Sequence, residues 1–285
     1  MLKRFFYRIF CGFFLGISIV APGFSGSLLA IIMGIYHDLV RIVSNPFKDF
    51  KRNVKFLLPL GIGAVLSAVL YVLLFDFLFE HYEKTMYLLF VGLIAGNVPP
   101  ILAEIKKCGF KKHYLFGGAA SFAVALTLGV FAVSLGEGTK AAGLTASLPV
   151  LALSGLAGGA AALVPGMSVS MILILTGVLG QVMFMASSLL HMDFTYLLPF
   201  GLFGLCAIVG LALSSNAIKI VFKKVPGFAN SAILGFMAGS LIGIFYQSLH
   251  LPDTNFNWLA GGIALFAGLG VSMLFVVIGK VMNKE

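Results

Sequence analysis

A Pro-Gly-x-Ser pattern is the part of this sequence best suited to bind a ligand. It occurs at Pro22–Ser25 and again, 143 positions later, at Pro165–Ser168. Proline ends a helix, glycine allows a close backbone approach, and serine caps a new helix. The first turn of that new helix has unpaired N–H groups and the positive end of the helix dipole, which favour an anion and above all a phosphate. The candidate phosphate-binding residues are Gly23, Ser25, Gly26, Ser27, Gly166, Ser168 and Ser170.

The two breaks belong to a longer internal repeat. Matching breaks in two halves of a membrane protein are typical of the central binding site of a transporter. The glycine pairs that precede each break favour close helix packing instead. The matched positions are Gly12 with Gly155, Gly16 with Gly159, Gly34 with Gly177, Leu57–Gly61 with Leu197–Gly201, and Gly92–Gly96 with Gly235–Gly239.

Composition indicates a polytopic membrane protein. The chain is 60% hydrophobic and 10% charged and has 34 glycines in 285 residues, which suits helices packed closely in lipid. Its net charge of +9 does not indicate nucleic acid, because the basic residues lie in short loops between apolar segments, where they face cytoplasm and anionic headgroups. Three distant cysteines without a C-x-x-C spacing indicate no disulfide framework and no metal site, and no cofactor is expected.

The apolar segments predict an all-α integral membrane fold made of two halves. Residues 9–20 reach only about 18 Å as a helix against about 30 Å of hydrocarbon, so they do not cross. With a second leg over 28–40, they predict a re-entrant hairpin at 9–42. The first half, 1–136, adds transmembrane helices at 56–79, 86–103 and 114–135. The second half, 148–285, has a hairpin at 148–190 and transmembrane helices at 197–218, 229–248 and 258–279.

The distribution of Lys and Arg predicts that the second half is inverted. Basic clusters flank the first hairpin on both sides, so that hairpin returns to the cytoplasm, and three crossings per half then place the second hairpin on the outer side. Of the 19 Lys and Arg, only Lys84 and Lys140 lie outside, and both termini are cytoplasmic. Aromatic side chains at the predicted span ends are expected to anchor them at the interface, namely Tyr82, Tyr87, Tyr196 and Trp258.

Four polar residues in or beside the spans are accessory candidates. Arg41 ends the second leg of the first hairpin, where it either complements the helix C-terminus or guides a phosphate at the cytoplasmic mouth. Asn97 and its repeat partner Ser240 either line a polar path or make ordinary helix contacts. Glu104 is expected at the membrane interface, and the alternative is proton coupling through Glu104 or Asp38.

In its glycine and Pro-Gly-x-Ser motifs the sequence resembles the bacterial polyprenyl-phosphate transporter family. The resemblance implies a multi-pass protein of the bacterial cytoplasmic membrane that returns undecaprenyl phosphate, a lipid carrier, from the outer to the inner leaflet. In the second copy, Val169 and Leu179 replace the Gly26 and Tyr36 of the first. The motifs that carry the resemblance are Gly12-x-x-x-Gly16, Ala21-Pro22-Gly23-x-Ser25-Gly26, Gly34-Ile35-Tyr36 and Pro165-Gly166-x-Ser168-x-Ser170.

Three other functions are weighed against this one. A helix N-terminus binds phosphate with or without a lipid tail, so a transporter or channel for a small soluble anion is the main alternative. A purely structural membrane protein is another. Undecaprenyl pyrophosphate phosphatases also resemble this plan, but their Pro-Gly-x-Ser-Arg-Ser motif supplies a cation and their chemistry needs carboxylates. Gly26 and Val169 stand at the arginine's position and the chain has no Glu-x-x-x-Glu pair, so an enzyme is not expected.

Overall fold

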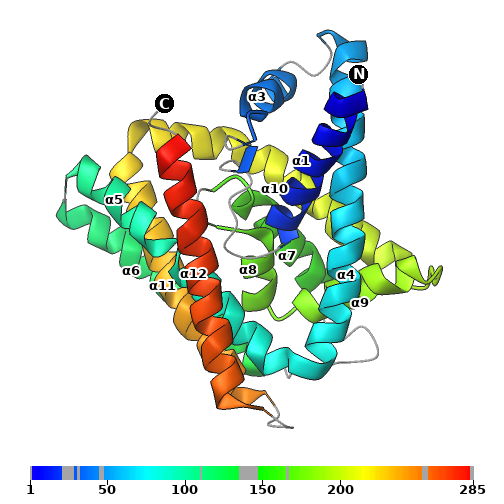
Figure 1. The fold of residues 1–285 in the computed structure, drawn as a ribbon. Coiled ribbons are helices and arrows are strands. Elements are labelled where there is room, and N and C mark those ends of the chain that lie inside the picture. Colours follow the sequence, from blue (N-terminus) through cyan, green and yellow to red (C-terminus); the bar gives the residue numbers. More distant parts are fainter. Residues whose placement is uncertain are drawn as a thin grey trace.

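Apolar segments form helices throughout the described part of the chain, where no strand occurs. Helices satisfy their own backbone hydrogen bonds, which a hydrocarbon environment requires. The computed structural model describes residues 2–20, 29–30, 33–44, 48–109, 111–134, 147–164, 167–251 and 256–282. Its helices (Figure 1) are α1 (Leu2–Val20), α3 (Tyr36–Ser44), α4 (Phe50–Ala95), α5 (Val98–Cys108), α6 (Lys112–Ser134), α7 (Leu148–Ala161), α8 (Val169–Leu175), α9 (Leu179–Leu190), α10 (Leu197–Lys224), α11 (Pro226–His250) and α12 (Trp258–Met282).

Six stretches of the described chain are long and apolar enough to cross a membrane, and they coincide with the six predicted spans. The prediction of an all-α fold with about six helices able to cross a membrane is therefore confirmed, and the bent pair of α8 and α9 would make a seventh if it were one span. Two of the stretches share helix α4, which bends at Tyr82 (φ −138°). The six are Phe50–Phe79, His81–Cys108, Lys112–Val133, Leu197–Lys224, Pro226–His250 and Trp258–Ile278.

Glycines bring α1 against the first part of α4, and α7 against α10, at backbone contact. A Cβ atom built on Gly12 would lie 2.0 Å from the Leu60 carbonyl oxygen. One built on Gly159 would lie 1.9 Å from the Ala207 carbonyl oxygen. The Gly-x-x-x-Gly pairs therefore serve helix packing, as their spacing predicts.

The two interfaces also share one register. Gly12 faces Leu60 as Gly155 faces Phe203, 143 positions later. The sequence match of Leu57–Gly61 with Leu197–Gly201 has an offset of 140 and is therefore displaced by about one helical turn from the packing register.

The last crossing of each predicted half packs on the other half. Helix α6 lies along α11, and α12 lies along the last part of α4. A Cβ on Gly235 would meet the Gly118 carbonyl oxygen of α6 at 1.9 Å, and one on the repeat partner Gly92 would meet the Leu265 carbonyl oxygen of α12 at 2.0 Å. The equivalent residues Gly92 and Gly235 thus each pack against the third crossing of the opposite predicted half, α12 and α6 respectively. In this sense the two predicted halves are interlocked.

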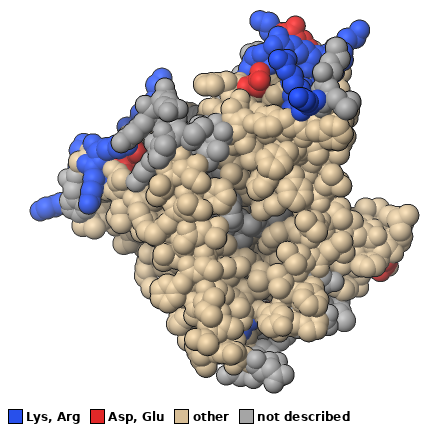
Figure 2. Space-filling model, viewed as in Figure 1, with Lys and Arg blue, Asp and Glu red and all other residues tan. Residues whose placement is uncertain are grey.

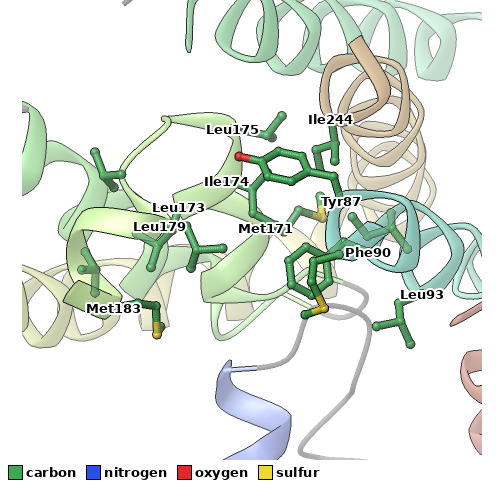
Figure 3. Packing of buried hydrophobic residues seen from close by; sticks show 14 of the residues in the cluster. Tyr87, Phe90, Leu93, Met171, Leu173, Ile174, Leu175, Leu179, Met183 and Ile244 are labelled. Carbon is green, nitrogen blue, oxygen red and sulfur yellow. The ribbon is translucent and has the colours of Figure 1, made fainter. Parts of the chain in front are cut away.

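The core of the molecule is built around the short helix α8, whose residues 170–175 are all buried. Side chains of α4 and α11, including Phe90 and Ile244, surround Met171 and Ile174 (Figure 3). Tyr87 is part of this core and is only 5% exposed, so its predicted role as an interface anchor is wrong. The position of a residue near a span end does not specify which face of the helix its side chain occupies. Tyr87 lies on the face of α4 that packs on the core.

Basic side chains gather at one end of the molecule in the view of Figure 2. They lie over α1, α3 and the start of α4, and over the connection from α5 to α6. Lys84 lies beside the start of α12, at the opposite end in Figure 1, where its ammonium is 4.8 Å from the ring centre of Phe256 and 5.3 Å from that of Trp258. This separation is the pattern expected of helices that cross a membrane between a basic face and a face poor in Lys and Arg.

Replacing Tyr71 with phenylalanine is expected to stabilise the protein by about 1 kcal/mol. The Tyr71 hydroxyl is buried in α4 and has no hydrogen-bond partner among the described residues, so its desolvation is uncompensated there. Thermal unfolding in detergent measures the change. The control is Tyr7→Phe, which loses the hydrogen bond that the Tyr7 hydroxyl donates to the Met33 carbonyl at 2.8 Å and should not stabilise. A lower unfolding temperature for Tyr71→Phe would contradict the prediction.

Candidate functional site

The second Pro-Gly-x-Ser break leads into α8, and Ser168 caps that helix. Its backbone is extended (φ −135°, ψ 157°), and its hydroxyl oxygen accepts a hydrogen bond from the Met171 N–H at 3.3 Å. The Ser168 and Ser170 hydroxyl oxygens lie 3.0 Å apart and form a hydrogen bond. Both side chains are buried, at 7% and 2% exposure. The prediction that a new helix begins at the second Pro-Gly-x-Ser corner is confirmed, whereas capping by Ser25 or Ser27 at the first corner falls outside the described residues.

This serine pair retains a donor that the described residues do not use. Two hydroxyl groups have two hydrogens, and the bond between Ser168 and Ser170 uses one of them. The Met171 N–H donates to Ser168 and therefore consumes an acceptor site, not a hydrogen. Among the described residues no acceptor takes the remaining hydrogen, so the pair is able to donate to an anion at the start of α8.

The first break lies outside the described residues, as do Gly23, Ser25, Gly26 and Ser27 and, in the second copy, Gly166. What precedes the first break is described: α1 ends at Val20. Helix α1 contacts α8, which begins one residue after Ser168. The helix that leads into the first break therefore adjoins the helix that leaves the second.

A glycine in the left-handed conformation interrupts the second leg of both hairpins. Gly34 has φ +66° and its repeat partner Gly177 has φ +74°. The Ile35 N–H donates to the Ala30 carbonyl at 2.9 Å, and the Val178 N–H donates to the Leu173 carbonyl at 3.0 Å. This bond across six residues is a helix C-cap that glycine adopts without strain.

These caps correct the predicted hairpins. A second leg continuous over 28–40 is wrong, because the helix ends before Gly34 and α3 begins at Tyr36. The segment predicted as the second hairpin, 148–190, likewise contains three helices, with an angle of 117° between α8 and α9. The sequence carried the signal, since Gly34 and Gly177 match at the repeat offset, but glycine alone does not distinguish close packing from a left-handed cap.

Three of the accessory candidates make local contacts. The Asn97 amide donates to the Leu93 carbonyl at 3.0 Å, and the Ser240 hydroxyl donates to the Phe236 carbonyl at 2.6 Å. Both bonds are to the preceding turn of the helix. Glu104 forms an ion pair of 2.6 Å with Lys107, and half of its side chain is exposed, so its interfacial placement stays a prediction.

Arg41 belongs to a second group of residues, which sequence reasoning did not find. Its guanidinium forms an ion pair of 2.9 Å with Asp38, on the same helix α3. Both residues line a cavity of about 500 Å³ at the basic end of the molecule, which we name the basic pocket. The basic clusters on either side of 9–42 were a signal for it, but they predict orientation and not convergence. The lining residues are Arg8, Asp38, Arg41, Lys51, Arg52, Lys55 and Phe56.

Comparison with known proteins decides the family. A family model described as undecaprenyl phosphate translocase-like matches residues 15–257, a range that includes both breaks. The chain belongs to this family. It is also 31% identical, over 278 residues, to a polyprenyl-phosphate transporter of Staphylococcus aureus, a match that covers 93% of this chain and 94% of that protein. No solved structure matches.

Membership supports the prediction of a transporter rather than an enzyme. The family is described as translocase-like and the relative from Staphylococcus aureus as a transporter. The resemblance to the polyprenyl-phosphate transporter family, which rested on the two breaks and the surrounding glycines, is thereby confirmed. In the described part of the chain, no group of three or more His, Cys, Asp or Glu is placed to hold a metal ion.

Proposed function

We propose that this protein carries undecaprenyl phosphate, or a closely related polyprenyl phosphate, from the outer to the inner leaflet of the bacterial cytoplasmic membrane. The phosphate binds between the two Pro-Gly-x-Ser breaks. The observation that supports this site most directly is the buried pair of Ser168 and Ser170, one hydroxyl hydrogen of which finds no acceptor among the described residues. A phosphate oxygen at the start of α8 would be an acceptor for this donor.

The topology that we propose is an inverted repeat with cytoplasmic termini. Both hairpins are re-entrant, the first from the cytoplasm and the second from outside. Three observations support it: the basic end shown in Figure 2, the glycine caps at Gly34 and Gly177 with equivalent hydrogen bonds, and the exchange of α6 and α12 between the halves. An odd number of crossings per half turns the second copy over relative to the first.

Binding at the breaks separates headgroup from tail. Backbone N–H groups of the first turn, the serine hydroxyl groups and the helix dipole attract the phosphate. In our proposal Gly23, Ser25, Gly26 and Ser27 approach from the first hairpin, and Gly166, Ser168 and Ser170 approach from the second. The polyprenyl tail stays in the bilayer, because its apolar surface gains nothing from entering a polar site. We assign no coupling ion, since Glu104 is paired with Lys107 at an exposed position.

A leaflet-specific assay in proteoliposomes tests the function. Undecaprenyl phosphate placed in one leaflet should become accessible in the other only when the protein is present, and free inorganic phosphate should slow the exchange because it competes for the same N–H and hydroxyl donors. Uptake of free phosphate in the absence of lipid exchange would favour the small-anion alternative. Phosphate release from undecaprenyl pyrophosphate would contradict the assignment as a transporter.

A further inference from the structure

The basic pocket joins three segments that are far apart in sequence. Arg8 comes from α1, and Asp38 and Arg41 come from α3. The remaining lining residues lie in the first two turns of α4. The Arg8 guanidinium lies 4.7 Å from the ring centre of Phe56 and donates to the Lys55 carbonyl at 3.2 Å. Both legs of the first predicted hairpin thus meet the first crossing at this pocket, under the upper right group of charges in Figure 2.

The charges in the basic pocket are not balanced by the described residues. Five cations line it, and Asp38, the carboxylate among the described lining residues, is paired with Arg41. The side chains of Lys51, Arg52 and Lys55 make no ion pair or hydrogen bond within the described part of the chain, and all three are exposed. Like charges that converge on one cavity repel each other and raise the local concentration of anions. The arrangement favours an anionic ligand.

The second half does not repeat the charged residues of this pocket. At the repeat offset of 143, Leu151, Gln181 and Phe184 replace Arg8, Asp38 and Arg41. The segment 191–199, which leads into α10, contains no Lys or Arg. It contains Asp193, and hydrogen bonds from the Thr195 hydroxyl and N–H lower the pKa of this carboxyl, which keeps it anionic. The charged residues that line the basic pocket are therefore not repeated at the equivalent positions of the second half.

We propose that the basic pocket is a second binding site for a phosphate monoester group, distinct from the breaks. That the natural ligand is the headgroup of a polyprenyl phosphate rests on the proposed function. A phosphate monoester offers up to two negative charges and three acceptor oxygens, and guanidinium groups match its geometry with paired N–H donors. A cavity of about 500 Å³ is large enough for the headgroup.

One-sided binding has a defined consequence for transport. A site present at one end raises the affinity for the lipid at that face but cannot by itself drive net movement, because an uncoupled carrier does not change the equilibrium between leaflets. The basic pocket therefore holds the translocated headgroup at the end that we place in the cytoplasm.

The test compares two triple variants that each remove three exposed cations from the basic end. The pocket variant is Lys51→Gln, Arg52→Gln and Lys55→Gln, and the control is Lys106→Gln, Lys111→Gln and Lys112→Gln, outside the pocket lining. Equilibrium binding of farnesyl phosphate to the purified full chain in detergent is measured, with inorganic phosphate and phosphatidylglycerol as competitors. In the pocket variant, binding at the pocket should weaken roughly tenfold to a hundredfold while binding at the breaks persists, so that one of two classes of site is lost, and the control should keep both classes like the wild type.

Three outcomes would overturn the second site. Unchanged binding in the pocket variant would do so, as would an equal loss in both variants, which would indicate diffuse surface charge. Competition by phosphatidylglycerol as strong as that by inorganic phosphate would assign the pocket to anionic lipids in general. If inorganic phosphate competes with an affinity equal to that of farnesyl phosphate, the pocket recognises the phosphate group alone, and this outcome supports the site. Because binding is measured without transport, failure of the leaflet assay in the wild type would disprove the proposed function and leave this result standing.

Discussion

Removal of both hydroxyl groups at the start of α8 should reduce transport of polyprenyl phosphate by roughly tenfold. The variant is Ser168→Gly with Ser170→Ala. The one hydroxyl hydrogen of this pair that no described residue accepts is worth about 1.5 kcal/mol as a donor to a phosphate oxygen, and about 1.4 kcal/mol corresponds to a factor of ten. Glycine is itself an acceptable N-cap, so the loss of the bond to the Met171 N–H should cost only a few tenths of a kcal/mol.

The control for this variant is Ser248→Ala. Ser248 is 1% exposed and its hydroxyl donates to the Phe245 carbonyl at 2.7 Å in its own helix, so the replacement removes a buried serine hydroxyl away from the proposed site. Leaflet exchange in proteoliposomes gives the transport rate, and thermal unfolding in detergent shows whether the proteins remain folded. A folded double variant that transports at the wild-type rate would exclude the serine pair from phosphate binding.

Replacing Gly210 with alanine should destabilise the protein by roughly 3 kcal/mol or more. A Cβ atom at this position would lie 2.1 Å from the Leu156 carbonyl oxygen and 2.8 Å from the carbonyl carbon. Those atoms are backbone of α7, so no side-chain rotation relieves the overlap, and the two helices must move apart. Because α7 leads toward the second break, the change should also lower transport.

Helix α10 supplies its own control. Gly204 lies in the same helix and has no atom within 4 Å of its Cβ position, so Gly204→Ala should be neutral or stabilise by up to about 1 kcal/mol. The unfolding temperatures of the two variants in the same detergent give the comparison. Equal unfolding temperatures would show that α7 and α10 are not held at backbone contact.

Length and apolarity predicted the membrane helices, because a crossing needs about 20 residues whatever its partners are. The capping role of Ser168 was likewise predictable, since capping depends on residues within one turn. The partners of the crossings were not. Gly92 and Gly235 were matched as repeat positions, but a glycine does not specify which helix packs against it. The exchange of α6 and α12 between the halves was therefore visible only in the structure.

The candidate site was predicted less completely than the fold. The basic pocket depends on contact between α1, α3 and α4, and a sequence pattern that locates charges along the chain gives no distance between them. The break at Gly34 depends on one backbone angle in the left-handed region, which many glycines never adopt. Tyr87 was assigned to the interface from its position along a span, whereas burial is decided by the direction that its face takes after the bend at Tyr82.

The interlocked halves have a consequence for biosynthesis. When the ribosome has completed residues 1–134, α12 is not yet present to pack against Gly92 of α4, and α11 is not yet present to pack against α6. Backbone that should be shielded by a tightly fitted neighbour stays open to lipid until α11 and α12 are inserted. We therefore expect the predicted first half to complete its packing only after α11 and α12 have been inserted.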